Sequence, residues 1–173
     1  MNKYELTDQT VTAGYGATLH RIRALRDFGS TKAGDLGGYI EAERNLSHEG
    51  NCWVYGEAKV YGDAKVSGDA WVFNIAQLFG NAKVYDNARV YGNARVYDNA
   101  QVSGKAWVHA NAKVCYNAWV YDKAQVSDYA WVYGDARVYG KARVYGKARV
   151  SGNTWVFGEA QLDEVPQQDV WYT

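Results

Sequence analysis

Residues 88–99 read Ala-Arg-Val-Tyr-Gly-Asn-Ala-Arg-Val-Tyr-Asp-Asn, which is one six-residue pattern written twice. The pattern continues in both directions without a slip, with its aliphatic position running from 54 to 162 in steps of six. These positions form 19 consecutive repeats, of which 17 carry Val and two carry Leu. Two residues earlier, 17 of the 19 repeats carry Ala, and the exceptions are Cys52 and Thr154. This uniformity indicates that the small residue is sterically confined.

The repeat predicts a coil of short strands. In Ala-x-Val-Tyr, strand alternation places Ala and Val on one side and x and Tyr on the other. The next two residues, mostly Gly-Asn, Gly-Asp, Gly-Lys or Asp-Asn, tolerate the positive φ of a tight corner. Strands of about four residues, three to a triangular rung, then give about six rungs stacked about 4.8 Å apart. A helix is excluded because a six-residue period leaves no apolar stripe along a helix of 3.6 residues per turn.

Composition narrows the functional classes. The chain has 173 residues, 19 basic and 19 acidic side chains and a formal net charge of zero. These values favour one domain and give no electrostatic reason to expect binding to nucleic acid or an anionic membrane. No apolar run approaches the roughly 18 residues of a spanning helix, and residues 1–8 lack an apolar stretch of signal-peptide length. We therefore expect a cytoplasmic protein. Its two cysteines, Cys52 pointing inward and Cys115 pointing outward, are expected to be reduced thiols.

The repeat Val-Tyr-Gly-Asn-Ala-Arg resembles the hexapeptide repeat of left-handed parallel β-helices, in which a small residue follows an aliphatic one four places later. This resemblance covers residues 46–162 and implies an all-β fold with a left-handed coil. A narrower resemblance includes Gly37-Gly38-Tyr39-Ile40 and Gly50-Asn51-Cys52-Trp53-Val54-Tyr55, which look like the leading segment of the bacterial YdcK group and of phage-borne hexapeptide proteins. The YdcK group is assigned a transferase role mainly by its fold, so this likeness says more about the cap than about chemistry.

Three segments are predicted. Residues 1–45 form an N-terminal cap, in which Lys3–Thr7 and Ala17–Leu25 read as the strands of a β-hairpin that covers the first rung. Residues 34–38 read as a loop. Residues 46–162 form the β-helix, and residues 163–173 form a tail that folds over the last rung or docks on another subunit.

Because each face repeats every 18 residues, the sequence predicts neighbours along a face. On the first face, Arg89 lies one rung from Trp71 and one rung from Trp107, a spacing that allows the guanidinium to stack on both rings. The third face has the same arrangement around Arg137. The candidate binding and interface residues are Trp53, Tyr55, Trp71, Phe73, Arg89, Tyr91, Trp107, Trp119, Arg137 and Trp155.

An exposed aromatic strip over several rungs indicates an interface, because soluble monomers seldom expose large apolar patches. The alternative is that stacked rings only stabilise successive rungs. Family resemblance implies a homotrimer, and the aromatic platforms also suit a protein or glycan partner. An end-to-end polymer is the third possibility, and the lid and Pro166 oppose it.

A hexapeptide acyltransferase needs a histidine base and an acyl-CoA groove between subunits. His109, outward on the first face beside an irregular corner, is the candidate base; His20 and His48 are expected to be structural. The repeat has no insertion that supplies a loop for the groove, and no three histidines converge on a metal. We therefore predict a non-catalytic binding or structural module without cofactor or metal, with an acyl-CoA-dependent acyltransferase as the alternative.

Overall fold

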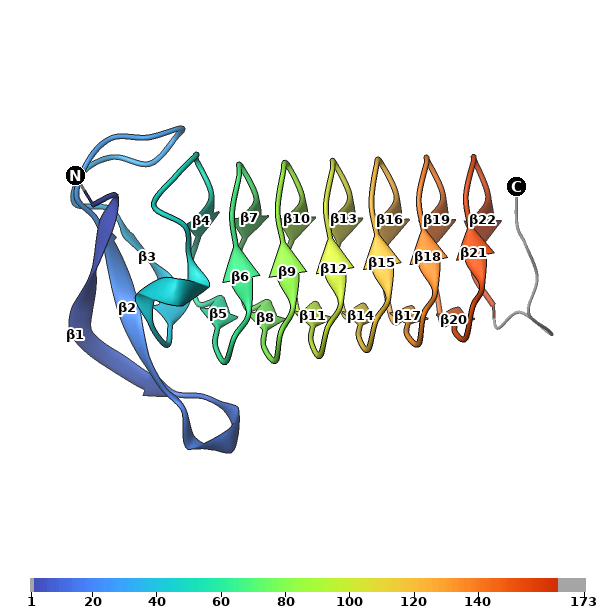
Figure 1. Ribbon diagram of the computed structural model, residues 1–173, viewed down its shortest axis with the longest axis horizontal. Helices are drawn as coiled ribbons and strands as arrows, with labels where there is room; N and C mark the ends of the chain where they lie inside the picture. The colour runs from blue at the N-terminus through green and yellow to red at the C-terminus, as the bar shows by residue number, and fades with distance from the viewer. Residues whose placement is uncertain (1, 165–173) are drawn as a thin grey trace.

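The computed structural model describes residues 2–164 and shows an antiparallel lid followed by a three-sided β-solenoid (Figure 1). In the lid, β1 (Tyr4–Thr12) and β2 (Thr18–Ala24) pair antiparallel across the 3-10 turn η1 (Gly14–Gly16). The predicted hairpin cap is therefore confirmed, with a first strand that is longer than expected. The prediction for the tail concerns residues 165–173, which lie outside the described part of the chain.

The lid connects to the solenoid through a third strand. β3 (Leu36–Ile40) pairs antiparallel with β2 and parallel with β5 (Lys59–Val60), and the 3-10 turn η2 (Glu43–Asn45) leads into the first rung. The expectation of a loop at residues 34–38 is wrong for its last three residues, because Gly37 and Gly38 bring the backbone of β3 close to the coil. The lid sheet and the second face of the solenoid are thus one continuous sheet.

The solenoid consists of three parallel columns of short strands. The first face comprises β4 (Trp53–Val54), β7 (Trp71–Val72), β10 (Arg89–Val90), β13 (Trp107–Val108), β16 (Gln125–Val126), β19 (Arg143–Val144) and β22 (Gln161–Leu162). The second face continues from β5 through β8 (Gln77–Leu78), β11 (Arg95–Val96), β14 (Lys113–Val114), β17 (Trp131–Val132) and β20 (Arg149–Val150). The third face comprises β6 (Lys65–Val66), β9 (Lys83–Val84), β12 (Gln101–Val102), β15 (Trp119–Val120), β18 (Arg137–Val138) and β21 (Trp155–Val156).

The register matches the predicted 18-residue rung. Trp71 pairs with Arg89, which pairs with Trp107, and the same offset holds on the other faces. The seven strands of the first face give about seven turns when the incomplete first and last coils are included. Each strand spans two residues rather than about four, although Trp71 and Phe73 both donate backbone hydrogen bonds to the next rung, at 2.9 and 3.0 Å.

The core is a column of small aliphatic side chains. Every Ala and Val at the inward positions from Ala58 to Val150 is at most 1% exposed. Inward space is limited because three faces meet around a narrow axis, which explains the near-invariant alanine of the repeat. Cys52 is inward, as predicted. Cys115 points outward from its face, as predicted, and its side chain is completely buried there.

The corners bear out the predicted backbone geometry. Asp86, Asp122 and Asp128 adopt φ values between 57° and 59° at positions where other rungs carry Gly. Their carboxylates accept hydrogen bonds from the backbone N–H of the corner one rung further on, at 3.0 to 3.2 Å. At another corner an amide ladder runs from Asn81 through Asn99 and Asn117 to Asp135. Side chains at these corners therefore tie rungs together.

In the stretch that the structure covers, no helix is long and apolar enough to cross a membrane.

Candidate functional site

The outer surface of the first face contains a cation held between two indole rings. The Arg89 guanidinium carbon lies 4.9 Å from the ring centroid of Trp71 and 5.6 Å from that of Trp107. The parallel register creates this arrangement, since it places the three outward side chains of β7, β10 and β13 in one row. Each cation–π contact contributes roughly 0.5–2 kcal/mol, so Arg89 fixes the orientation of both indoles.

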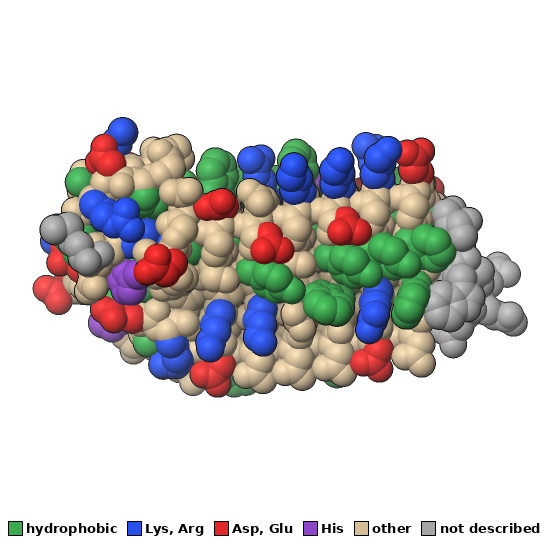
Figure 2. Space-filling view, turned by 45° about the horizontal axis from the view of Figure 1, so that its top comes forward, with side chains coloured by type: hydrophobic (Ala, Val, Ile, Leu, Met, Phe, Trp, Pro, Cys, Tyr) green, Lys and Arg blue, Asp and Glu red, His purple; other side chains and the backbone are tan. Residues whose placement is uncertain are grey.

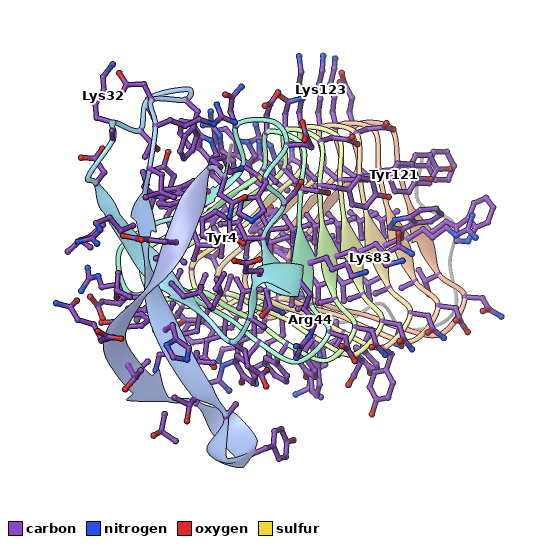
Figure 3. All side chains as sticks on the ribbon, turned by 60° about the vertical axis from the view of Figure 1, so that its left-hand side comes forward. Tyr4, Lys32, Arg44, Lys83, Tyr121 and Lys123 are labelled. Carbon is purple, nitrogen blue, oxygen red and sulfur yellow. The ribbon has the colours of Figure 1, made fainter. Side chains whose placement is uncertain are left out.

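The third face repeats this arrangement nearer the C-terminal end. Arg137 lies 5.6 Å from the ring centroid of Trp119 and 5.1 Å from that of Trp155. Beside it, stacked rings of Tyr121, Tyr139 and Phe157 have centroids 4.9 and 5.2 Å apart. The space-filling view shows this cluster as a continuous aromatic patch around one cation (Figure 2). Tyr121 projects outward from the coil in the view along the solenoid (Figure 3).

The second face carries a third stack, which sequence reasoning missed. Here the order is inverted, because the ring of Trp131 lies between Lys113 Nζ at 5.4 Å and the Arg149 guanidinium at 5.6 Å. The Trp131 Nε1–H group donates a hydrogen bond of 3.1 Å to Cys115 Sγ, and this indole covers the thiol. Burial raises the pKa of Cys115. The 18-residue steps from Lys113 to Trp131 and from Trp131 to Arg149 were the signal that could have revealed the stack.

A second column of rings on the first face is incomplete at its lid end. Phe73 stacks on Tyr91 at 4.6 Å, and Tyr91 stacks on His109 at 4.8 Å. Tyr55 occupies the next position toward the lid, but its hydroxyl lies 3.3 Å from the hydroxyl oxygens of Ser30 and Thr31 in the lid. The Tyr55 ring consequently packs against Trp71, at 5.7 Å and 69°, and does not stack on Phe73.

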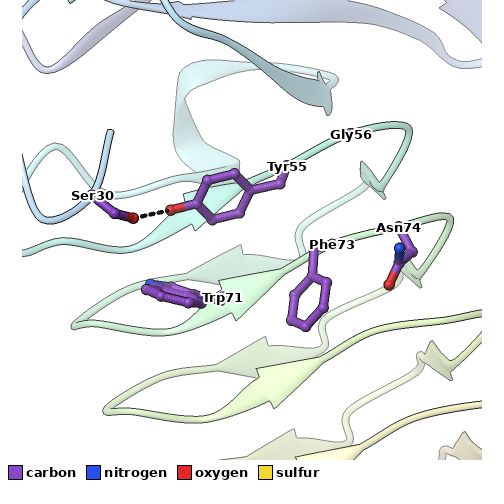
Figure 4. A pocket seen from close by; sticks show the side chains of 6 residues that line it. All are labelled: Ser30, Tyr55, Gly56, Trp71, Phe73 and Asn74. Carbon is purple, nitrogen blue, oxygen red and sulfur yellow. Dashed lines mark hydrogen bonds between the residues drawn. The ribbon is translucent and has the colours of Figure 1, made fainter. Parts of the chain in front are cut away.

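The displacement of Tyr55 opens a shallow groove beside Phe73, which we call the ring slot. It has a volume of about 380 Å³ and is lined by Ser30, Tyr55, Gly56, Trp71, Phe73 and Asn74 (Figure 4). The lining is mainly aromatic, with the Ser30 hydroxyl and the Asn74 amide at the rim. A flat ring that entered this slot would continue the column of stacked rings toward the lid.

The comparison with known protein families and the structure both indicate a β-solenoid. A family model described as the YdcK β-solenoid repeat matches residues 82–97, 88–104, 94–110 and 142–158. The matched residues are therefore similar to the repeats of YdcK-type hexapeptide proteins. The chain is 37% identical over 62 residues to a protein named uncharacterized acetyltransferase YdcK from Escherichia coli strain K12. That match covers 32% of this chain and only 19% of the relative.

In this solenoid, Trp53 is not part of the outer aromatic surface. Its side chain is completely buried, with ring centroids 5.1 Å from Phe28 and 6.0 Å from Tyr4. The prediction that Trp53 lines an exposed wall with Trp71 is therefore corrected, because the lid covers the outer side of β4. The other predicted interface residues lie on the outer surface and are half-buried, apart from Trp107, which is 36% exposed.

His109 lies at the end of the ring column of the first face. Its ring stacks on Tyr91 with an angle of 5° between the planes. Within residues 2–164 neither ring nitrogen has a hydrogen-bond partner, while the backbone N–H donates to the Val126 carbonyl oxygen. Burial lowers the pKa of His109, while the charge of Asp128 acts in the opposite direction. A neutral imidazole can accept a proton, but within residues 2–164 the ring is positioned by stacking on Tyr91 and not by a hydrogen bond to an acid–base partner.

The other two histidines have structural contacts. His48 stacks on Tyr4 at 4.4 Å and accepts a hydrogen bond from the Lys3 backbone N–H at 3.1 Å. His20 Nδ1 lies 3.2 Å from the Thr7 carbonyl oxygen within the hairpin. Across the described residues no three His, Cys, Asp or Glu side chains gather to hold a metal.

Proposed function

We propose that this YdcK-type chain is a non-catalytic binding module that associates with itself and holds a partner on its aromatic and arginine-lined faces. The observation that carries the proposal is the ring slot, where one ring of an ordered column is displaced and the exposed face of Phe73 remains available. Stacked aromatic faces with few polar groups at the rim suit an aromatic side chain of a protein or the apolar face of a sugar ring.

Self-association is assigned to the third face. Its aromatic patch around Arg137 spans three successive rungs, and rings in such patches supply large contact areas at small entropic cost. The ring slot lies on a different face, so assembly through the third face leaves the slot open. A homotrimer is the proposed assembly, as the hexapeptide resemblance implies.

The assembly is tested by absolute mass in solution, measured by light scattering at low micromolar concentration. We expect three times the chain mass of 19.3 kDa. Arg137→Glu should give the monomer mass, because a carboxylate between two indoles removes both cation–π contacts and repels the electron-rich ring faces. Arg149→Glu, which alters the stack on the second face, is the matched control and should remain trimeric. A monomeric wild-type chain would refute self-association, and the ring slot would then be the remaining proposed binding surface.

The ring slot is tested with two small probes, N-acetyltryptophanamide and methyl glucoside, titrated while the indole N–H resonance of Trp71 is followed by NMR. We expect at least one probe to shift this resonance. Phe73→Ala should weaken that binding about three- to tenfold, the equivalent of one aromatic pair. Phe79→Ala is the matched control, since Phe79 is covered on both sides by Tyr61 and Tyr97. Equal losses in the two variants, or no shift with either probe, would contradict a site at Phe73.

The second candidate is an acyltransferase that binds acyl-CoA between subunits, and the name of the Escherichia coli relative supports it. The relative's name concerns a much longer protein, of which the match covers 19%. Within the described coil, 19 repeats follow one another without a protruding loop, and His109 has no orienting partner. Acetyl transfer from acetyl-CoA that disappears in His109→Ala would favour this candidate over the binding module.

A further inference from the structure

A buried lysine and a buried cysteine meet where the lid closes the solenoid. Lys3 precedes β1 and Cys52 precedes β4, and both side chains are completely buried. The Lys3 Nζ atom lies 3.2 Å from Cys52 Sγ and 3.0 Å from the Cys52 carbonyl oxygen. Cys52 occupies a position at which 17 of the 19 repeats carry Ala, so packing of the coil does not require a thiol there. The pair therefore needs a chemical explanation.

The surroundings hold the amine against the sulfur. The carbonyl oxygens of Gly50 and Glu49 lie 3.4 and 3.5 Å from Lys3 Nζ, and the Phe28 ring centroid lies 5.1 Å away. Within residues 2–164 no carboxylate forms an ion pair with Lys3. Lys3 Nζ donates in each of these contacts, to the three carbonyl oxygens and to Cys52 Sγ, and together they hold the nitrogen beside the sulfur.

Burial shifts the pKa values of Lys3 and Cys52 in the directions that favour their neutral forms. Burial is the main influence on both groups: it lowers the pKa of Lys3 and raises the pKa of Cys52, since each loses the water that stabilises its charged form. A lowered pKa increases the share of Lys3 that is in the neutral, nucleophilic form at a given pH. The 3.2 Å contact thus places the Lys3 amine beside the sulfur that it would attack once that sulfur is oxidised.

We propose that Lys3 and Cys52 form a reversible covalent sulfur–nitrogen cross-link when the protein meets a peroxide. Hydrogen peroxide first oxidises the Cys52 thiol to a sulfenic acid and is itself reduced to water. The Lys3 Nζ lone pair then attacks Sγ, the S–O bond breaks, and the departing hydroxide takes a proton from nitrogen to form a second water. The net change is one peroxide reduced to two waters and two hydrogens lost from the protein.

The cross-link would join the strand that begins the lid to the first rung of the coil. Lys3 lies in the lid, and the Cys52 backbone N–H donates to the Gly68 carbonyl oxygen of the next rung. A bond from residue 3 to residue 52 would close a loop across the lid and restrict its opening. The site is separate from the ring slot and does not depend on the proposed binding function.

The test uses the full chain treated with hydrogen peroxide, followed by intact-mass measurement and peptide mapping. We expect the mass to fall by about 2 Da and one cross-linked peptide to contain residues 3 and 52, with both changes reversed by a thiol reductant. Cys115→Ala should behave as the wild type, whereas Cys52→Ala should not change mass in this way. The wild-type peptide map decides the question even if a variant fails to fold. Oxygen adducts on Cys52 without a link to Lys3, or an unmodified pair, would overturn the proposal.

Discussion

Trp53→Ala is expected to lower the free energy of unfolding by about 3–5 kcal/mol, the cost of removing a large buried ring from a packed core. Trp53 is the largest completely buried side chain of the structure and lies where the lid meets the first rung. Its ring contacts Phe28 and Tyr4 edge-on, and the Tyr4 hydroxyl donates a 2.8 Å hydrogen bond to the Leu46 carbonyl oxygen. The truncation therefore loosens the contact between lid and coil as well as creating a cavity.

The effect is measured by urea unfolding followed by circular dichroism, with Trp107→Ala as the matched control. Trp107 occupies the equivalent position of a later rung but is 36% exposed. We expect the control to lose no more than about 1–2 kcal/mol, from its contact with Arg89 and its partial burial. Similar losses in both variants would mean that Trp53 belongs to the outer surface, contrary to its burial beneath the lid.

The repeating part of the fold could be predicted from the sequence because every rung faces the same packing problem. A residue such as Ala94 or Val96 is placed by its spacing alone, since the neighbours above and below obey the same pattern. The stacking of Arg89 and Arg137 between indoles followed from the 18-residue period for the same reason. Because the pattern repeats every 18 residues, one local rule predicts which residues of successive rungs are in contact.

The non-repeating contacts could not be predicted in this way. β3 pairs with both the lid and the coil, and nothing in residues 34–40 specifies that register. Trp53 reads like Trp71 in the sequence, and only the packing of the lid distinguishes the two. The ring slot likewise depends on the hydrogen bonds that Tyr55 makes to Ser30 and Thr31, more than 20 residues earlier in the chain.

The contacts that the repeat does not predict are concentrated at the junction between the lid and the coil. The regular rungs stack their rings and expose little that is distinctive, whereas the junction buries Lys3, Cys52 and Trp53 and displaces Tyr55. On one side the first rung packs against the lid and not against another rung, so the repeat pattern does not provide the residues for these contacts. Residues outside the pattern are needed to pack the lid on the coil, and the ring slot results from that packing.

Gly38→Ala is the substitution expected to separate the lid from the coil most effectively. A Cβ at residue 38 would lie 2.6 Å from the Ala58 carbonyl oxygen and 2.8 Å from a Val54 methyl carbon. Neither neighbour can yield easily, since the Ala58 carbonyl oxygen accepts the 2.9 Å hydrogen bond from the Tyr39 N–H that begins the pairing of β3 with β5. Relief of the overlap must displace β3, at a cost of about 3 kcal/mol.

Urea unfolding of Gly38→Ala measures that cost, and the indole N–H resonance of Trp53, followed by NMR, reports where it falls. We expect this resonance to change at urea concentrations below the main transition, because the lid opens and exposes the indole before the coil unfolds. Gly14→Ala is the matched control: its added Cβ meets only the Tyr61 hydroxyl at 3.3 Å, at the far end of a side chain. A Gly38→Ala variant as stable as this control would show that β3 does not approach the coil as closely as the structure places it.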